Sequence, residues 1–379
     1  MNQAHRGLVE TALSIGVDIS SQISILYAPP GAWSHGYLWG ADVMTIPRDA
    51  AFSPQTNGVN KPNHLLVGGV EPGPASAYAL EIDSPTAVRG LNALVGDGVA
   101  AQFALGSFEG ASGAELPAGS AVFGADTATR AILDRVGKDV GLRFHRVAAS
   151  ALPALDPVDR VPRIAVLTGA VNQDVWSMRD LDFPADPIST GTLNTAAEDP
   201  LLNYDVIFNT AGYPSAANVT ARARLQAFFS RGGGYIGAGA NGGNFLVTGA
   251  QVTGFTAATR SGNGRSGIVY WNNTGGTSSP IVGTYPAQDT AIVDPPTWFT
   301  SVPSTMTVDG RLLASGFFAA GLWAIDALSQ TAAGAAVIAH GTNTAGNARV
   351  TLFAMNPLYR ADPEREWPAV GAAAYWADQ

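Results

Sequence analysis

Short apolar runs alternate along the chain with segments of helical spacing, and this alternation predicts an α/β protein. In the first half, the runs typical of strands occur at 65–70, 78–82, 101–105, 121–125 and 142–147. Helices are predicted between them, one over 127–140 and one that begins at the cap signal Ser84-Pro85. The apolar residues of the latter share one helical stripe: Val88, Leu91, Leu94 and Val95. We therefore predict a layered α/β domain over residues 1–150, which also includes a helix over 1–20 and strands at 22–29 and 41–47.

A second α/β pattern begins after the Pro-rich stretch 151–162, which we interpret as a linker. Residues 163–169 form a continuous apolar run of the kind found in buried parallel sheets. A similar run follows at 204–212, and a helix is predicted from the cap residue Asn218 to Gly232. The second domain is therefore predicted over residues 163–379.

The composition changes inside this second domain, between residues 252 and 307. Gly, Thr, Ser and Asn dominate there, which favours short antiparallel strands and loops over helices. Apolar runs at 335–341 and 348–357 and a predicted helix over about 363–375 then complete the domain. We interpret 252–307 as a β-rich insertion into an α/β domain.

The charge balance narrows the classes of partner. Charged residues make up only 13% of the 379 residues, against about 25% in typical soluble domains. The net charge is -9, and no run of Lys or Arg occurs, so nucleic acids and anionic membrane surfaces are disfavoured as partners. No apolar run approaches the roughly 18 residues that span a bilayer, so no membrane insertion is expected.

The chain contains no cysteine, which excludes disulfides, thiolate metal sites and cysteine nucleophiles together. This composition fits a secreted bacterial protein, and we expect an extracellular location. None of the five histidines is followed three residues later by Asp or Glu, so the H-x-x-E pair of zinc peptidases is missing. We expect no bound zinc and no other cofactor. Among the histidines, His145 alternates with apolar residues in a predicted strand, and we expect it to face solvent.

A glycine-rich segment follows a predicted strand and concentrates the candidate chemistry of the second domain. Gly237, Gly239 and Gly242 form a literal G-x-G-x-x-G, which in a strand-to-helix turn can hold a pyrophosphate. However, no long helical pattern follows, and no acidic residue lies about 20 residues later to bind a ribose. Dinucleotide binding is therefore disfavoured.

The same segment, Gly232-Gly233-Gly234-Tyr235-Ile236-Gly237-Ala238-Gly239-Ala240-Asn241, resembles the G-G-G-x-x-G-x-C-x-G motif of class I glutamine amidotransferases. Gly239 stands in the place of the nucleophilic cysteine, and Asn241 stands in the place of the last glycine. The family's later H-P-E segment corresponds to Asn356-Pro357-Leu358. The resemblance covers about 220 residues and implies a flavodoxin-like fold with an elbow at Gly239.

Thioester chemistry needs a thiolate and a base that activates it, and neither position carries such a residue. The catalytic set is therefore expected to be vestigial at Gly239, Asn356 and Leu358, and glutaminase activity is not expected. We expect Gly239 to have a positive φ and to face Asn356 across a cleft in which an anion or a carboxylate could bind. The candidate ligand-binding residues at these strand ends are Gly237, Gly239, Asn241, Asn209 and Asn356.

A wider resemblance involves three segments, at 32–47, 78–95 and 348–360. They are similar to the region that follows the catalytic domain in zinc carboxypeptidases of the carboxypeptidase A family from high-GC actinobacteria. In those proteins a degenerate amidotransferase-like domain closes the polypeptide. The resemblance implies a non-catalytic accessory region that serves docking, substrate presentation or assembly, with an upstream carboxypeptidase domain or a peptide surface as partner.

Two alternative functions remain open at the level of sequence. One is a free-standing hydrolase or small-ligand binder whose site is the cleft at Gly237–Asn244. The other is an extracellular binder of glycans or cell wall, in which Trp271 and Trp298 of the insertion would stack on sugar rings. Burial of these two indoles would be the structural alternative. An oligomer is compatible with each of these functions.

Overall fold

The computed structural model describes residues 16, 18–22, 35–41, 44, 67–167, 173–260 and 265–379. The helix expected over 1–20 and the strands expected at 22–29 and 41–47 lie largely outside these residues. Of the first segment, Asp18 forms a parallel bridge with Gly321. A short helix, α2 (His35–Trp39), is the first helix described. Within the described residues, no helix is both long and apolar enough to cross a membrane.

The N-terminal unit is built on a six-stranded sheet with the order β1-β7-β2-β6-β3-β8. The pair β1–β7 is parallel, and the other pairs in this sheet are antiparallel. Its helices begin at capping side chains, because Ser84 accepts the N–H of Ala87 and Asp126 accepts the N–H of Ala128. The elements are β1 (Gly69–Val70), β2 (Ala77–Leu80), α3 (Pro85–Gly96), β3 (Ala101–Ala104), β4 (Phe108–Glu109), β5 (Glu115–Leu116), β6 (Ala121–Gly124), α4 (Thr127–Val140), β7 (Arg143–Val147), η1 (Ala149–Ala151) and β8 (Leu155–Val158).

The stretch predicted as a linker is in part a strand. Residues 155–158 form β8, which pairs antiparallel with β3 at the edge of the first sheet. Proline is compatible with an edge position, because an edge strand needs only one side of its backbone for pairing. Pro157 occupies such a position opposite Gln102. The connection to the second sheet is therefore shorter than the predicted 151–162.

The second sheet has a parallel core with the order of a flavodoxin-like fold. Its strands are β9 (Ile164–Leu167), β10 (Ala185–Ile188), β11 (Val206–Asn209), β12 (Gly234–Ala238) and β20 (Arg349–Phe353). In space they follow the order β10-β9-β11-β12-β20, and all four neighbouring pairs are parallel. Counted along the chain, this is the order 2-1-3-4-5. The predicted fold class, α/β with a flavodoxin-like second domain, is confirmed.

Antiparallel strands extend the same sheet beyond β20. The order continues as β19-β17-β14-β15, while β13, β16 and β18 pair at the side of this path. The predicted β-rich insertion at 252–307 is therefore made of strands, and it extends further than expected, to Leu322. These strands are β13 (Thr256–Thr259), β14 (Ser266–Asn273), β15 (Gln288–Val293), β16 (Thr297–Ser301), β17 (Met306–Leu312), β18 (Phe318–Leu322) and β19 (Ala336–Thr342).

Helices cover both faces of the parallel core, as alternate residues of β12 show. Gly234 faces α10 (Trp367–Asp378), because a Cβ at this glycine would lie 2.4 Å from the carbonyl oxygen of Ala377. The next residue, Tyr235, faces the other side and packs against Phe229 and Phe245. The remaining helices are α5 (Gln173–Asp180), α6 (Thr190–Thr195), η2 (Pro200–Asn203), α7 (Val219–Ser230), α8 (Gly239–Thr248), η3 (Gly276–Ser278), α9 (Ala327–Gln330), η4 (Tyr359–Ala361) and η5 (Glu364–Glu366).

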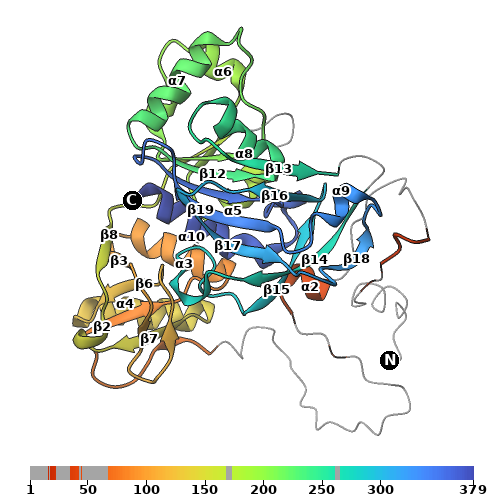
Figure 1. Cartoon of the computed structure of the whole chain (residues 1–379). Helices are drawn as coiled ribbons and strands as arrows, with labels where there is room; N and C mark the ends of the chain where they lie inside the picture. Colours follow the sequence, from red (N-terminus) through yellow and green to blue (C-terminus); the bar gives the residue numbers. More distant parts are fainter. Residues whose placement is uncertain are drawn as a thin grey trace, which may run out of the picture.

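The two sheets are joined by direct packing of α3 against α10, which lie side by side in Figure 1. A Cβ at Gly371 would approach the side chain of Val88 to 2.5 Å, so the helices meet at van der Waals distance there. Tyr375 donates a hydrogen bond to Asn92, and Asn92 donates one to the carbonyl oxygen of Leu181 at 2.6 Å. One continuous cluster of buried apolar residues runs through both units. The two sheets are separate, but their cores are shared.

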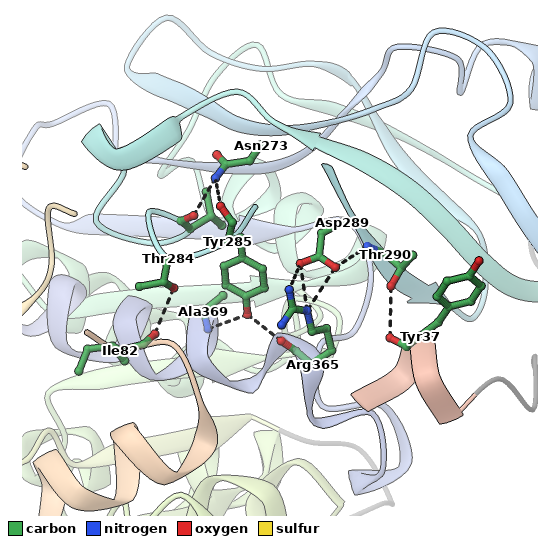
Figure 2. A network of polar contacts seen from close by, with 10 residues as sticks. Tyr37, Ile82, Asn273, Thr284, Tyr285, Asp289, Thr290, Arg365 and Ala369 are labelled. Atoms are coloured by element: carbon green, nitrogen blue, oxygen red, sulfur yellow. Dashed lines mark hydrogen bonds and ion pairs between the residues drawn. The ribbon is translucent and has the colours of Figure 1, made fainter. Parts of the chain in front are cut away.

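A polar network fastens the C-terminal segment to the insertion (Figure 2). Arg365 pairs with Asp289 of β15, its Nε lying 2.9 Å from Oδ2, and its guanidinium lies over the ring of Tyr285. The hydroxyl of Tyr285 donates to the carbonyl oxygen of Arg365 at 2.8 Å and accepts the N–H of Ala369. Thr284 reaches the N-terminal unit through the carbonyl oxygen of Ile82. This network holds the N-terminal end of α10 in place relative to both sheets.

His145 of β7 does not face solvent as expected. Its ring lies between two carboxylates, with Nδ1 at 3.2 Å from Glu71 and Nε2 at 3.4 Å from Glu81. The side chain is only 12% exposed. Asp83 adds a further acidic group near the ring, while Arg143 pairs with Glu71 at 2.6 Å. The contact with Glu81 is the main reason that the pKa of His145 is raised above its usual value.

The stability of the N-terminal unit is expected to fall as the pH rises past about 6.5, the usual pKa of histidine. Because the folded state raises the pKa of His145, the stabilisation is complete below the unfolded pKa and is lost as pH rises through the folded pKa. Urea unfolding over a pH series checks this. His145→Gln should remove the dependence in that window. An identical pH profile in the variant would contradict the assignment.

Candidate functional site

The strand β12 runs directly into α8, and the junction is Gly239. Gly239 has φ +67 and is the first residue of α8, as expected for an elbow between strand and helix. Its N–H lies 3.4 Å from the carbonyl oxygen of Met355, which follows β20. The helix itself was not predicted, since four glycines lie between 237 and 243 and glycine has low helix propensity.

Two of these glycines explain why the helix forms where it does. A Cβ at Gly242 would lie 2.5 Å from the carbonyl carbon of Gly237, and a Cβ at Gly237 would lie 2.9 Å from that of Gly242. The hydroxyl of Tyr235 also donates to the carbonyl oxygen of Gly242 at 2.7 Å. The G-x-G-x-x-G pattern therefore serves close packing of helix on strand, and Gly237 is not available to a ligand.

A cleft of about 240 Å³ opens at the carboxyl ends of β11, β12 and β20. Gly239 and Asn356 both line it, so the expected convergence of these two residues across 117 positions of sequence is confirmed. Ligands of open α/β sheets bind at this end of the strands. The lining residues are Thr210, Ala238, Gly239, Ala240, Asn241, Thr259, Asp294, Pro295, Thr297, Ala354 and Asn356.

Asn356, which the sequence resemblance places opposite the histidine of glutamine amidotransferases, is fixed by two hydrogen bonds. Its Oδ1 accepts the N–H of Leu358 at 3.0 Å, and its Nδ2 donates to Asp174 at 3.4 Å. Leu358, which the resemblance places opposite the acid of that motif, is fully buried in the apolar core and does not line the cleft. A Cβ at Gly239 would meet no atom within 4 Å, so the backbone leaves space for a side chain to begin there.

Asp174 of α5 is a site residue that sequence reasoning missed. Its side chain is buried behind the cleft, where it accepts hydrogen bonds from Asn356 and from Thr210 at 3.1 Å. Burial raises the pKa of its carboxyl, although the two hydrogen bonds act in the opposite direction. An isolated Asp with no motif around it carries no sequence signal, since only the fold brings α5 beside Asn356.

Of two other residues that the sequence suggested as ligand-binding, the structure places one in the cleft and one outside it. Asn209 is fully buried and does not line the cleft. Its amide donates to the carbonyl oxygen of Ala211 and to Tyr235, and its Oδ1 accepts the N–H of Ala211. It is therefore a structural residue that shapes the end of β11. Asn241 does line the cleft, and its Nδ2 lies 3.3 Å from the carbonyl oxygen of Thr210.

The expectation that Trp271 and Trp298 bind glycans is wrong. Their exposed fractions are 1% and 0%, so neither indole can stack on a sugar at the surface. Trp298 donates its Nε1 proton to Thr331 at 3.1 Å and packs against Trp323. The Gly- and Thr-rich composition suggested exposed loops, but these residues lie in β14 and β16, whose alternation turns their side chains inward.

The lining residues contain no histidine, cysteine, lysine or arginine, so the described part of the cleft has no thiolate and no basic group. Asp294 is the one lining residue with an ionisable side chain. Among the described residues, no group of three or more His, Cys, Asp and Glu side chains is arranged to hold a metal ion. The cleft offers amides, hydroxyls and one carboxylate.

No family model matches this chain, and no curated protein matches it. Three solved structures share part of its shape. A protein from Thermoplasma acidophilum, provisionally named as a subunit of GMP synthase, has a TM-score of 0.37 and 10% identity, over 57% of this chain and 96% of that chain. A provisionally named ThuA-like protein from Bacteroides uniformis has a TM-score of 0.37 and 13% identity, over 55% and 87%. A cytoplasmic protein from Salmonella typhimurium has a TM-score of 0.35 and 11% identity, over 57% and 97%.

Proposed function

We propose that this chain is a non-catalytic accessory region whose second domain binds a small polar ligand in the elbow cleft. The observation that carries the proposal is the combination of an intact elbow with a vestigial catalytic set. Gly239 and Asn356 lie at the cleft, yet neither can act as nucleophile or base. Binding is the function that such a cleft supports best.

The geometry supports a ligand of a few heavy atoms. A cleft of about 240 Å³ is smaller than the roughly 300–1,000 Å³ typical of drug-sized ligands. Its walls come from the parallel core, with Ala354, and from the antiparallel extension, with Thr259 and Thr297. Thr259 and Thr297 lie in strands, and residues 239–241 lie in the first turn of α8, so regular structure holds these parts of the cleft.

The vestigial assignment predicts that the protein releases no ammonia from glutamine, in a coupled glutamate dehydrogenase assay. Gly239→Cys should be equally inactive, because Asn356 lacks the basic nitrogen that would deprotonate the new thiol. An authentic glutaminase assayed in parallel is the positive control. Ammonia release by the unmodified protein would show that the cleft catalyses a reaction and that the non-catalytic proposal is wrong.

The wider setting that we propose is a secreted zinc carboxypeptidase, in which this region would dock or present a peptide to an upstream catalytic domain. Support comes from the similarity of the segments at 32–47, 78–95 and 348–360 to the region after that catalytic domain. The gene sequence upstream of the codon for Met1 tests this. A reading frame that carries a carboxypeptidase module supports the setting, and an in-frame stop codon immediately upstream contradicts it.

A further inference from the structure

We propose that the elbow cleft selects a ligand with a cationic group that donates hydrogen bonds, such as an ammonium or an amidinium. This inference rests on the proposed function, because it names the ligand class of the same cleft. It differs from the sequence-based expectation that the elbow would hold an anion or a carboxylate. The three threonine hydroxyls that line the cleft already donate their single protons to other groups of the protein.

At the floor of the cleft, Thr210 and Asn356 both donate to the buried carboxylate of Asp174. Thr210 has a single hydroxyl proton, and it donates this proton to Asp174. Asn356 directs one of its two Nδ2 protons toward the same carboxylate, so the second proton of this amide, like the second of Asn241, can still be donated. The hydroxyl oxygen of Thr210 therefore retains only acceptor capacity toward a ligand. Asp174 lies behind both residues and is buried.

On the opposite wall, two threonines form a chain that consumes their protons. Thr297 donates to the carbonyl oxygen of Pro295 at 3.1 Å. The hydroxyls of Thr259 and Thr297 lie 3.2 Å apart, and since the proton of Thr297 is already used, Thr259 must be the donor of that contact. Both hydroxyls therefore offer lone pairs, and not protons, to a ligand in the cleft.

The charge at the cleft also favours a cationic ligand. The carboxylate of Asp294 lines the cleft and accepts the hydroxyl proton of Tyr359. A carboxylate has about four acceptor positions, so one hydrogen bond leaves others open. No Lys or Arg stands among the described lining residues, and Arg360, which lies over the ring of Tyr359, is outside this lining. A ligand that supplies positive charge and N–H donors would satisfy Asp294 and the threonine oxygens together, whereas an anion would be repelled.

Three probes of one carbon skeleton test the inference: propylammonium, 1-propanol and propionate. Binding to the full chain is measured by saturation-transfer difference NMR with titration. We expect propylammonium to bind in preference to the other two. Asp294→Asn retains an oxygen that accepts from Tyr359 but removes the charge, and it should weaken propylammonium binding by about tenfold. Asp139→Asn, which removes an exposed charge from α4, is the matched control and should leave binding unchanged.

Three other outcomes would contradict the ligand class, the binding function or the location of binding at the cleft. If propionate binds best and competes within the cleft, the cationic ligand class is wrong while a binding function remains. If none of the three probes binds to the unmodified protein, the proposed binding function fails as well. If Asp294→Asn and Asp139→Asn weaken propylammonium equally, the cation binds through the overall charge of -9 and not at the cleft, and the inference is overturned.

Discussion

Replacing Trp298 with alanine is expected to lower the free energy of unfolding by about 3–5 kcal/mol, the usual cost of truncating a buried tryptophan. The indole is fully buried, packs against Trp323 and donates its N–H to Thr331. The variant loses the burial of the ring, leaves a cavity between β16 and its neighbours, and leaves the hydroxyl of Thr331 without this donor. Chemical denaturation followed by circular dichroism measures the change.

Trp39→Ala serves as the matched control, because Trp39 is 52% exposed at the end of α2. Its effect on stability should be about 0.5 kcal/mol or less. The comparison also tests the glycan hypothesis. If Trp298→Ala kept the stability of the unmodified protein and lost binding on a glycan array, the indole would be a surface ligand contact and its burial in the structure would be wrong.

Replacing Gly242 with alanine is expected to destabilise the second domain by about 3 kcal/mol, at the upper end of typical overpacking costs. The new methyl group would lie 2.5 Å from the carbonyl carbon and 2.7 Å from the Cα of Gly237. These are backbone atoms of a central strand, so they cannot rotate away as a side chain would. The first turn of α8 must move off β12, and the cleft beside it should bind propylammonium less tightly. Thermal unfolding and probe titration measure the two effects.

Gly239→Ala is the control for this prediction, since it adds the same methyl group three residues earlier. No atom lies within 4 Å of the new Cβ, so the cost comes only from the φ of +67 and should be about 1 kcal/mol. A larger loss of stability in Gly239→Ala than in Gly242→Ala would contradict the packing role given to Gly237 and Gly242. It would also mean that the elbow is tighter than the structure indicates.

The elbow was predictable in part from the residues that form it. The run from Gly232 to Asn241 indicated a strand that ends in a strained turn, and the positive φ of Gly239 is confirmed. The ten residues of α8 were not predictable, because a segment with several glycines has little intrinsic tendency to be helical. The helix forms because Gly237 and Gly242 allow strand and helix to touch, which is a tertiary contact.

The linker and His145 were also predictable only in part. Proline at 153, 157 and 162 indicated an irregular connection. However, an edge strand tolerates proline, and residues 155–158 pair with β3 as an edge strand. The period of two around His145 correctly placed it on the face opposite Phe144. That face is not open to water, because Glu71 and Glu81 come from the ends of two neighbouring strands. The alternation of residues along a strand predicts which face of the sheet a side chain lies on. Whether that face is exposed depends on the segments that cover it.

The sequence by itself determined the absence of thiol chemistry, since no cysteine occurs, and the alternation of strands and helices that leads to an α/β fold. It also determined which residues stand in the catalytic places of the resembling family. The tertiary structure alone decided that Trp271 and Trp298 are buried, that Asp294 and Asn356 line one cleft, and that Asp174 bonds to Asn356 behind it. The physical reason is that burial and convergence arise from contacts between distant segments, and local patterns of hydrophobicity carry no record of which strand will become a neighbour.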